Sequence, residues 1–194
     1  MLSRKLSITV PVLALVLVLS GFATAQKPPE DKSKRPSPPG TASIELKGKK
    51  VMIDYSRPSL KGRKLGTDLA SYGQVWRTGA NEATTLTTEV NLTIGGANVP
   101  AGKYSLWTLP SEETWKLIVN KQTMQPANSA GSPDVPLWGT HYDQAQDLVR
   151  IDMQKSAIDK PVEQFTISFH IKDNNTFLVL EWENTRVSVP IKAQ

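Results

Sequence analysis

The chain has 194 residues, with 23 basic and 18 acidic side chains and no cysteine. The absence of cysteine excludes disulfides, cysteine nucleophiles, thiolate metal sites and iron–sulfur clusters. The net charge of the chain is +5. Residues 1–25 and residues 26–40 each contribute a net charge of +2, so residues 41–194 carry a net charge near +1. No nucleic-acid partner is therefore expected, because nucleic-acid binding needs a basic face on the folded domain itself.

Residues 1–25 are predicted to be a secretory signal peptide. Arg4 and Lys5 form its positive start, residues 8–19 form an apolar run, and Ala23-Thr24-Ala25 has the small-x-small pattern of a cleavage site. The run is shorter than the roughly 20 apolar residues that span a bilayer, so cleavage is favoured over a retained anchor. We therefore expect an exported protein, periplasmic or extracellular, whose mature chain carries no transmembrane helix.

Residues 26–40 are predicted to be a basic, proline-rich tether. The stretch holds five prolines and no large apolar side chain, so it has nothing to bury and is expected to be extended. A solvated spacer is the simplest interpretation, and contact with an anionic cell-surface polymer is the alternative.

Residues 41–194 are predicted to form one all-β domain. Strand patterns occur at residues 42–46, 51–55, 84–89, 90–94, 103–109, 115–119, 148–153, 165–171, 177–182 and 187–191. Gly95-Gly96 and Asp173-Asn174-Asn175 indicate tight turns, residues 121–137 indicate a long surface loop, and only residues 67–72 favour a turn of helix. Roughly ten short strands with few helices predict a single antiparallel β-sandwich or jelly-roll-like domain.

The stretch from Tyr55 to Thr85 concentrates polar and aromatic side chains on loops that contain four glycines. Arginine can hold an anionic group bidentately, and tryptophan rings stack on sugars. These residue types predict a binding site for a polar or anionic small molecule or a glycan. The candidate ligand-binding residues are Arg57, Lys61, Arg63, Trp76, Arg77, Asn81 and Glu82, together with Trp138 on a later loop.

Two other interpretations of this stretch stay open. Glu82 could be the general acid or base of a hydrolase acting on envelope material, if burial raised its pKa. Alternatively, Arg77 and Glu82 form an internal ion pair that fixes the loop, and the domain is a structural module that meets partners elsewhere. Trp115 and Trp182 lie in strand patterns and are predicted to belong to the core.

Familiar catalytic and cofactor motifs are missing from the sequence, including G-x-S-x-G, phosphate-binding glycine loops and H-E-x-x-H. His170 alternates with apolar residues of a strand and is expected to face solvent. The spacing of His141 from Asp143 or Glu82 gives little support for a metal site. No metal or cofactor is expected, and the sequence defines neither an activity nor an oligomeric state.

Several separated motifs nevertheless share one resemblance. The segments YSRPSLKGRK, YGQVWRTGANEATT, IGGANVPAGKYSLWTLP and WGTHYD, the last followed by LVRI, occur in this order between residues 42 and 191. Together they resemble the bacterial family called domain of unknown function 2911. The resemblance implies a single exported domain and supplies no catalytic residues. Its motifs mark Arg57, Arg77, Asn81 and Glu82 as positions to test.

Overall fold

The computed structural model describes residues 30–128 and 131–194, and within them residues 31–194 form one compact unit. The predicted signal peptide and the first residues of the predicted tether, 26–29, lie outside the described residues. The strands are β1 (Pro39–Leu46), β2 (Lys49–Ser56), β3 (Thr84–Thr88), β4 (Leu92–Ile94), β5 (Ala97–Val99), β6 (Gly102–Leu109), β7 (Trp115–Asn120), β8 (Met124–Gln125), β9 (Val135–Pro136), β10 (Asp147–Lys172) and β11 (Asn175–Ala193). Two short 3-10 helices, η1 (Lys32–Lys34) and η2 (Gln144–Gln146), complete the described elements. The predicted all-β class is confirmed.

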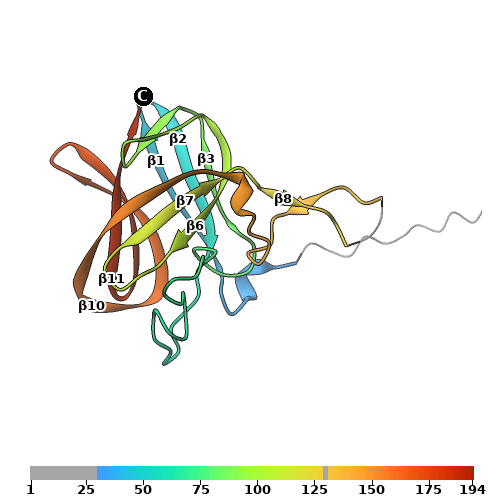
Figure 1. Ribbon diagram of the computed structural model, residues 1–194, viewed down its shortest axis with the longest axis horizontal. Coiled ribbons are helices and arrows are strands. Elements are labelled where there is room, and N and C mark those ends of the chain that lie inside the picture. The colour runs from blue at the N-terminus through green and yellow to red at the C-terminus, as the bar shows by residue number, and fades with distance from the viewer. Residues whose placement is uncertain (1–29, 129–130) are drawn as a thin grey trace, which may run out of the picture. The chain divides into compact units, whose positions relative to one another are not determined.

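Nine of the strands form one antiparallel sheet in the order β1-β2-β3-β6-β7-β10-β11-β4-β5, and β8 and β9 form a separate small hairpin. The first part of β10, residues 147–153, pairs with β7, whereas later parts pair with β11. β10 therefore passes from one layer to the other, as its long curved ribbon shows (Figure 1). The result is a sandwich-like domain built from one continuous sheet that bends.

The two long strands differ from the sequence prediction. Residues 148–153 and 165–171 were predicted as separate strands, as were residues 177–182 and 187–191, but each pair belongs to one strand. Residues 154–164, between the two predicted parts of β10, are mostly exposed and have no apolar pattern. The sequence therefore does not reveal that β10 is one strand. Register shifts between Ala157 and Thr166 interrupt the ladder and mark where β10 departs from regular pairing. The helical turn predicted at residues 67–72 is a non-helical turn region, and the predicted loop 121–137 contains β8 and β9.

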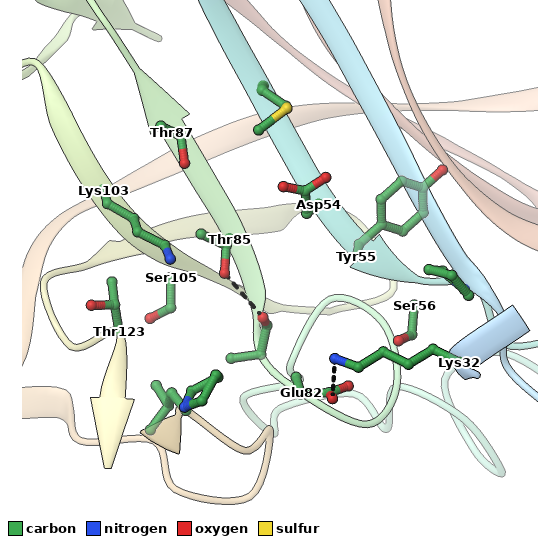
Figure 2. A pocket seen from close by; sticks show the side chains of 15 residues that line it. Lys32, Asp54, Tyr55, Ser56, Glu82, Thr85, Thr87, Lys103, Ser105 and Thr123 are labelled. Atoms are coloured by element: carbon green, nitrogen blue, oxygen red, sulfur yellow. Dashed lines mark hydrogen bonds and ion pairs between the residues drawn. The ribbon is translucent and has the colours of Figure 1, made fainter. Parts of the chain in front are cut away.

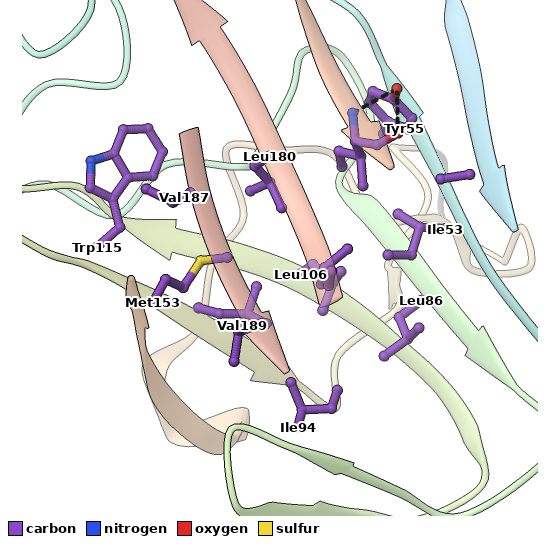
Figure 3. Packing of buried hydrophobic residues seen from close by; sticks show 14 of the residues in the cluster. Ile53, Tyr55, Leu86, Ile94, Leu106, Trp115, Met153, Leu180, Val187 and Val189 are labelled. Atoms are coloured by element: carbon purple, nitrogen blue, oxygen red, sulfur yellow. Dashed lines mark hydrogen bonds between the residues drawn. The ribbon is translucent and has the colours of Figure 1, made fainter. Parts of the chain in front are cut away.

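The core lies between the two layers. Val51, Ile53 and Tyr55 point inward from β2, as their alternation predicted, and are all buried. Side chains of β11 such as Leu180 and Val189 face them from the other layer (Figure 3). Trp115 and Trp182 also belong to this cluster, which confirms their predicted place in the core.

A seam of side-chain bonds joins the end of β2 to the later part of β10. The Tyr55 hydroxyl accepts the backbone N–H of Ile167 at 2.9 Å and donates to the carbonyl of the same residue at 3.3 Å. The Arg57 guanidinium donates from Nε to the Phe165 carbonyl at 3.3 Å and from Nη2 to Thr166 Oγ1 at 3.0 Å. These side chains satisfy backbone groups of β10 that a neighbouring strand would otherwise pair.

Two backbone bonds continue the seam, which we define as residues 55–60 against residues 163–167. The N–H of Phe165 donates to the Pro58 carbonyl and that of Leu60 to the Glu163 carbonyl, each at 2.9 Å. The seam therefore holds the two layers together along one side of the core.

Tyr55→Phe is expected to lower the free energy of unfolding by about 1–3 kcal/mol, because both backbone groups of the buried Ile167 lose their partner. Urea unfolding at neutral pH measures the change. Tyr72→Phe is the matched control, since no hydrogen bond of the Tyr72 hydroxyl occurs within residues 30–128 and 131–194. Equal stability of Tyr55→Phe and wild type would contradict the role assigned to the seam.

Candidate functional site

The predicted basic residues do not converge on one pocket. Arg57 is used in the seam, and Arg63 folds back on its own loop, donating to the carbonyls of Leu60 and Ser59 at 3.0 and 2.9 Å. Lys61 is exposed, and its backbone N–H donates to the Glu163 carboxylate. Arg57 and Arg63 thus donate to groups of the fold itself.

The two candidate tryptophans have different environments. Trp76 stacks on Trp182 with ring centroids 5.4 Å apart and meets Trp115 and Phe165 edge-on. It therefore packs in the core. Trp138 is 38% exposed on the loop that follows β9, next to Glu82 through an isolated β-bridge.

Arg77 packs against the backbone of the same loop. A Cβ atom at Gly139 would lie 2.2 Å from Arg77 Cδ, so only glycine leaves room for this side chain. Within the described ranges, the Arg77 guanidinium forms no hydrogen bond or ion pair. The predicted ion pair between Arg77 and Glu82 is therefore wrong.

Asn81 forms hydrogen bonds with three segments of the chain: the N-terminal segment, the end of β2 and the loop after β9. It adopts the left-handed conformation, with φ at 60°, and its amide nitrogen donates to the Ser37 carbonyl at 3.2 Å and to Ser56 Oγ at 3.3 Å. Its own carbonyl accepts the N–H of Gly139 at 3.0 Å. Asn81 is thus a structural residue that brings the N-terminal segment and the later loop to the end of β2.

Glu82 pairs with the N-terminal segment. Its carboxylate accepts hydrogen bonds from Lys32 Nζ and Arg35 Nη1, each at 2.8 Å. Burial by itself would raise the pKa of Glu82, but the hydrogen bonds from Lys32 and Arg35 outweigh it, and the pKa lies below the ordinary value. A carboxyl with a lowered pKa stays ionised at neutral pH, which does not suit a general acid.

These contacts also correct the predicted tether. Residues 31–40 belong to the same compact unit as the domain, and β1 already begins at Pro39. The Glu82 carboxylate attracts Lys32 and Arg35, and the N–H of Arg57 donates to the Pro38 carbonyl at 2.8 Å. The described part of the stretch is thus docked on the fold.

A polar row crosses the outer face of the sheet. Directly paired residues on β1, β2, β3, β6, β7 and β10 form this row: Thr41, Asp54, Thr85, Ser105, Asn120 and Asp147. A second row beside it on the first four of these strands contains Ser43, Met52, Thr87 and Lys103. Because paired residues share a face of a sheet, these side chains line one surface.

Part of this outer surface is covered and part is open. Loop residues Leu137 and Tyr142 pack over Trp107 and Ile118 and form a second, smaller core. Beside it lies a groove of about 350 Å³, shown in Figure 2. Its floor is formed by Met52, Asp54, Thr85, Thr87, Lys103 and Ser105, one wall by Lys32 and Pro39, and the other wall by Thr123, Pro136 and Leu137. Glu82 lies at one end.

Of the predicted site residues, only Glu82 lines this groove. Sequence reasoning missed Asp54, Lys103 and the hydroxyl-bearing residues, because it searched the loops and treated strands as scaffold. One signal was present: Leu86 is the apolar residue of the segment TTLTT in β3, which predicts that its neighbours Thr85 and Thr87 lie on the opposite face, where the groove is. The docking of Lys32 had no sequence signal.

The groove offers hydrogen-bonding groups and charges on rigid strands. In the described part of the chain, no group of three or more histidine, aspartate or glutamate side chains is placed to hold a metal ion. No helix in that part is long and apolar enough to cross a membrane. His141 and His170 are both exposed, as predicted for His170. The groove thus presents polar and charged side chains of paired strands, together with those of the loops beside them.

Glu82→Gln is expected to lower the free energy of unfolding by about 1 kcal/mol at pH 7, since it removes the charge of an ion pair that is partly exposed. The folded-state pKa of Glu82 is lowered, so this stabilisation is complete above the ordinary value of 4.5 and is lost as the pH falls through the folded-state pKa. Urea unfolding from pH 7 downward measures it, with the exposed Glu45→Gln as control. A difference between wild type and Glu82→Gln that does not shrink at acid pH would contradict the assignment.

Comparison with known proteins places the chain in a family. No curated protein and no solved structure gave a match. Residues 37–191 match the family described as "Protein of unknown function (DUF2911)", which covers most of the compact unit. The resemblance of the separated motifs is thereby confirmed, and the chain belongs to this family.

Proposed function

We propose that this domain is an exported, non-catalytic binding module that holds a polar small molecule or a unit of a glycan in the groove on the outer face of β2, β3 and β6. The observation that carries the proposal is the set of groove side chains without a protein partner. Within residues 30–128 and 131–194, Thr87, Thr123 and Lys103 form no side-chain hydrogen bond or ion pair. Polar groups that converge on one groove without partners are available to a ligand.

The rigidity of the floor supports the same function. Asp54, Thr85, Thr87 and Lys103 stand on three adjacent, paired strands, so their spacing is fixed by the sheet. Sites on strands are held more accurately than sites on loops. The volume of about 350 Å³ lies at the lower end of the roughly 300–1,000 Å³ of small-molecule pockets, which fits a ligand the size of one or two sugar rings.

In this proposal the binding site is the groove, and not the loops between Tyr55 and Thr85 that the sequence predicted. Arg57, Arg63 and Asn81 hold segments of the fold together, which agrees with the structural interpretation of those loops. Glu82 carries two cationic partners and a lowered pKa, so it gives little support to the alternative of a hydrolase. Binding in the groove requires neither an acid nor a base.

Amide chemical-shift mapping tests the proposal. Titration of the protein, residues 26–194, with glucose, maltose, glucuronate and glucose 6-phosphate is expected to shift the resonances of Thr85, Thr87 and Lys103 with at least one of these compounds. Saturable shifts confined to other surfaces, or no shift with any of the four, would contradict binding in the groove.

Thr87→Val is expected to weaken the binding of that compound by about 3- to 10-fold, because it removes one hydrogen-bonding group and keeps the shape of the side chain. The Thr87 hydroxyl has no partner among the described residues, so stability should change little. Thr176→Val, on β11 and outside the groove lining, is the matched control. Isothermal titration calorimetry gives the affinities, and equal affinity of Thr87→Val and wild type would count against contact with the groove floor.

A further inference from the structure

The charges of the groove differ in whether they are already paired. At one end, Glu82 forms ion pairs with Lys32 and with Arg35. Asp54 accepts a hydrogen bond from Thr41 at 2.7 Å and keeps its second carboxylate oxygen for another donor. Lys103 is exposed, and no ion pair to it occurs within the described ranges. Lys103 is thus the charge of the groove that is open to an anion.

Hydroxyl donors surround Lys103. Thr87 is its direct partner on β3, Ser105 lies two residues further along the same face of β6, and Thr123 stands on the opposite wall. The Trp107 indole N–H donates to Ser105 Oγ at 2.9 Å, so the Ser105 hydroxyl has its own hydrogen left to donate. Figure 2 shows the Lys103 amine reaching over the floor toward Thr85 and Ser105. This end of the groove therefore presents hydrogen-bond donors and one positive charge.

Neighbouring positions on β2 and β3 present acceptors. Thr85 Oγ1 donates to the Ala83 carbonyl, which leaves its lone pairs to accept, and Asp54 is its register partner on β2. Acceptors of this kind suit the hydroxyl groups of a sugar. The groove floor therefore places the acceptors at Asp54 and Thr85 beside the donors at Lys103, Thr87 and Ser105.

We infer that the groove binds an acidic sugar, with the sugar's carboxylate held by Lys103, Thr87 and Thr123 and its hydroxyl groups directed to Asp54 and Thr85. The inference rests on the proposed binding function and names the class of ligand. A carboxylate is favoured over a phosphate because Lys103 is the one cationic side chain of the lining without an ion pair in the described ranges, whereas Lys32 is paired with Glu82. A single unpaired lysine matches one negative charge, whereas a dianion would also be repelled by Asp54.

Isothermal titration calorimetry with glucuronate, glucose and glucose 6-phosphate tests the inference. Wild-type protein is expected to bind glucuronate about tenfold more tightly than glucose, since a charge-assisted hydrogen bond is worth more than a neutral one. Lys103→Met should remove this preference and leave the affinity for glucose within about twofold, because only the charged contact is lost. Lys49→Met, at the exposed start of β2, is the matched control and should change neither affinity.

The outcomes separate the two proposals. If glucose and glucuronate bind in the groove equally, and Lys103→Met changes neither, the acidic-sugar inference fails while the binding function stands. Tighter binding of glucose 6-phosphate than of glucuronate would also overturn the inference. If neither these three compounds nor maltose shifts the groove resonances, the proposed function fails with it. Because Lys103 is exposed, its variants should fold, and Lys103→Gln provides a second test of the same contact.

Discussion

The contact between Tyr55 and the backbone of Ile167 is the constraint on which the rest of the domain depends. One phenol satisfies both backbone groups of a residue 112 positions away and so takes the place of a strand neighbour. Arg57, two residues further along the chain, continues the seam by donating hydrogen bonds to Phe165 and Thr166. With this side joined, the continuous sheet can cover one core with both of its layers.

The position of the groove follows from that closure. Tyr55 points inward to the seam, so its neighbours Asp54 and Ser56 must point outward, where the groove lies. The loop that follows β2 is then occupied with structural contacts, among them those of Asn81 and Arg63. The residues with the most evident binding chemistry in the sequence therefore support the fold, and plainer side chains on the strands form the open surface.

Much of the fold could be predicted from the sequence, because alternation reports directly which strand residues are buried. Val51, Ile53 and Tyr55 illustrate this, as does the hairpin at Gly95-Gly96. The unity of β10 could not be predicted, since its middle part is exposed and carries no apolar pattern. The groove could not be predicted either, because its floor depends on the register of three strands, β2, β3 and β6, that are separated in the sequence. The partners of Glu82 could not be predicted either, since Lys32 and Arg35 lie 50 and 47 residues away in a stretch without large apolar side chains.

From the same long separation we expect a particular order of folding. The hairpins β4–β5 and β6–β7 join strands that are consecutive in the chain. The contact between Tyr55 and Ile167, in contrast, closes a loop of 112 positions that contains most of the domain. Contacts of such high sequence separation pay the largest entropic cost and slow the folding of β proteins. The seam is then among the last parts to assemble, and until it does, the edge of β10 stands open to pairing with a second chain.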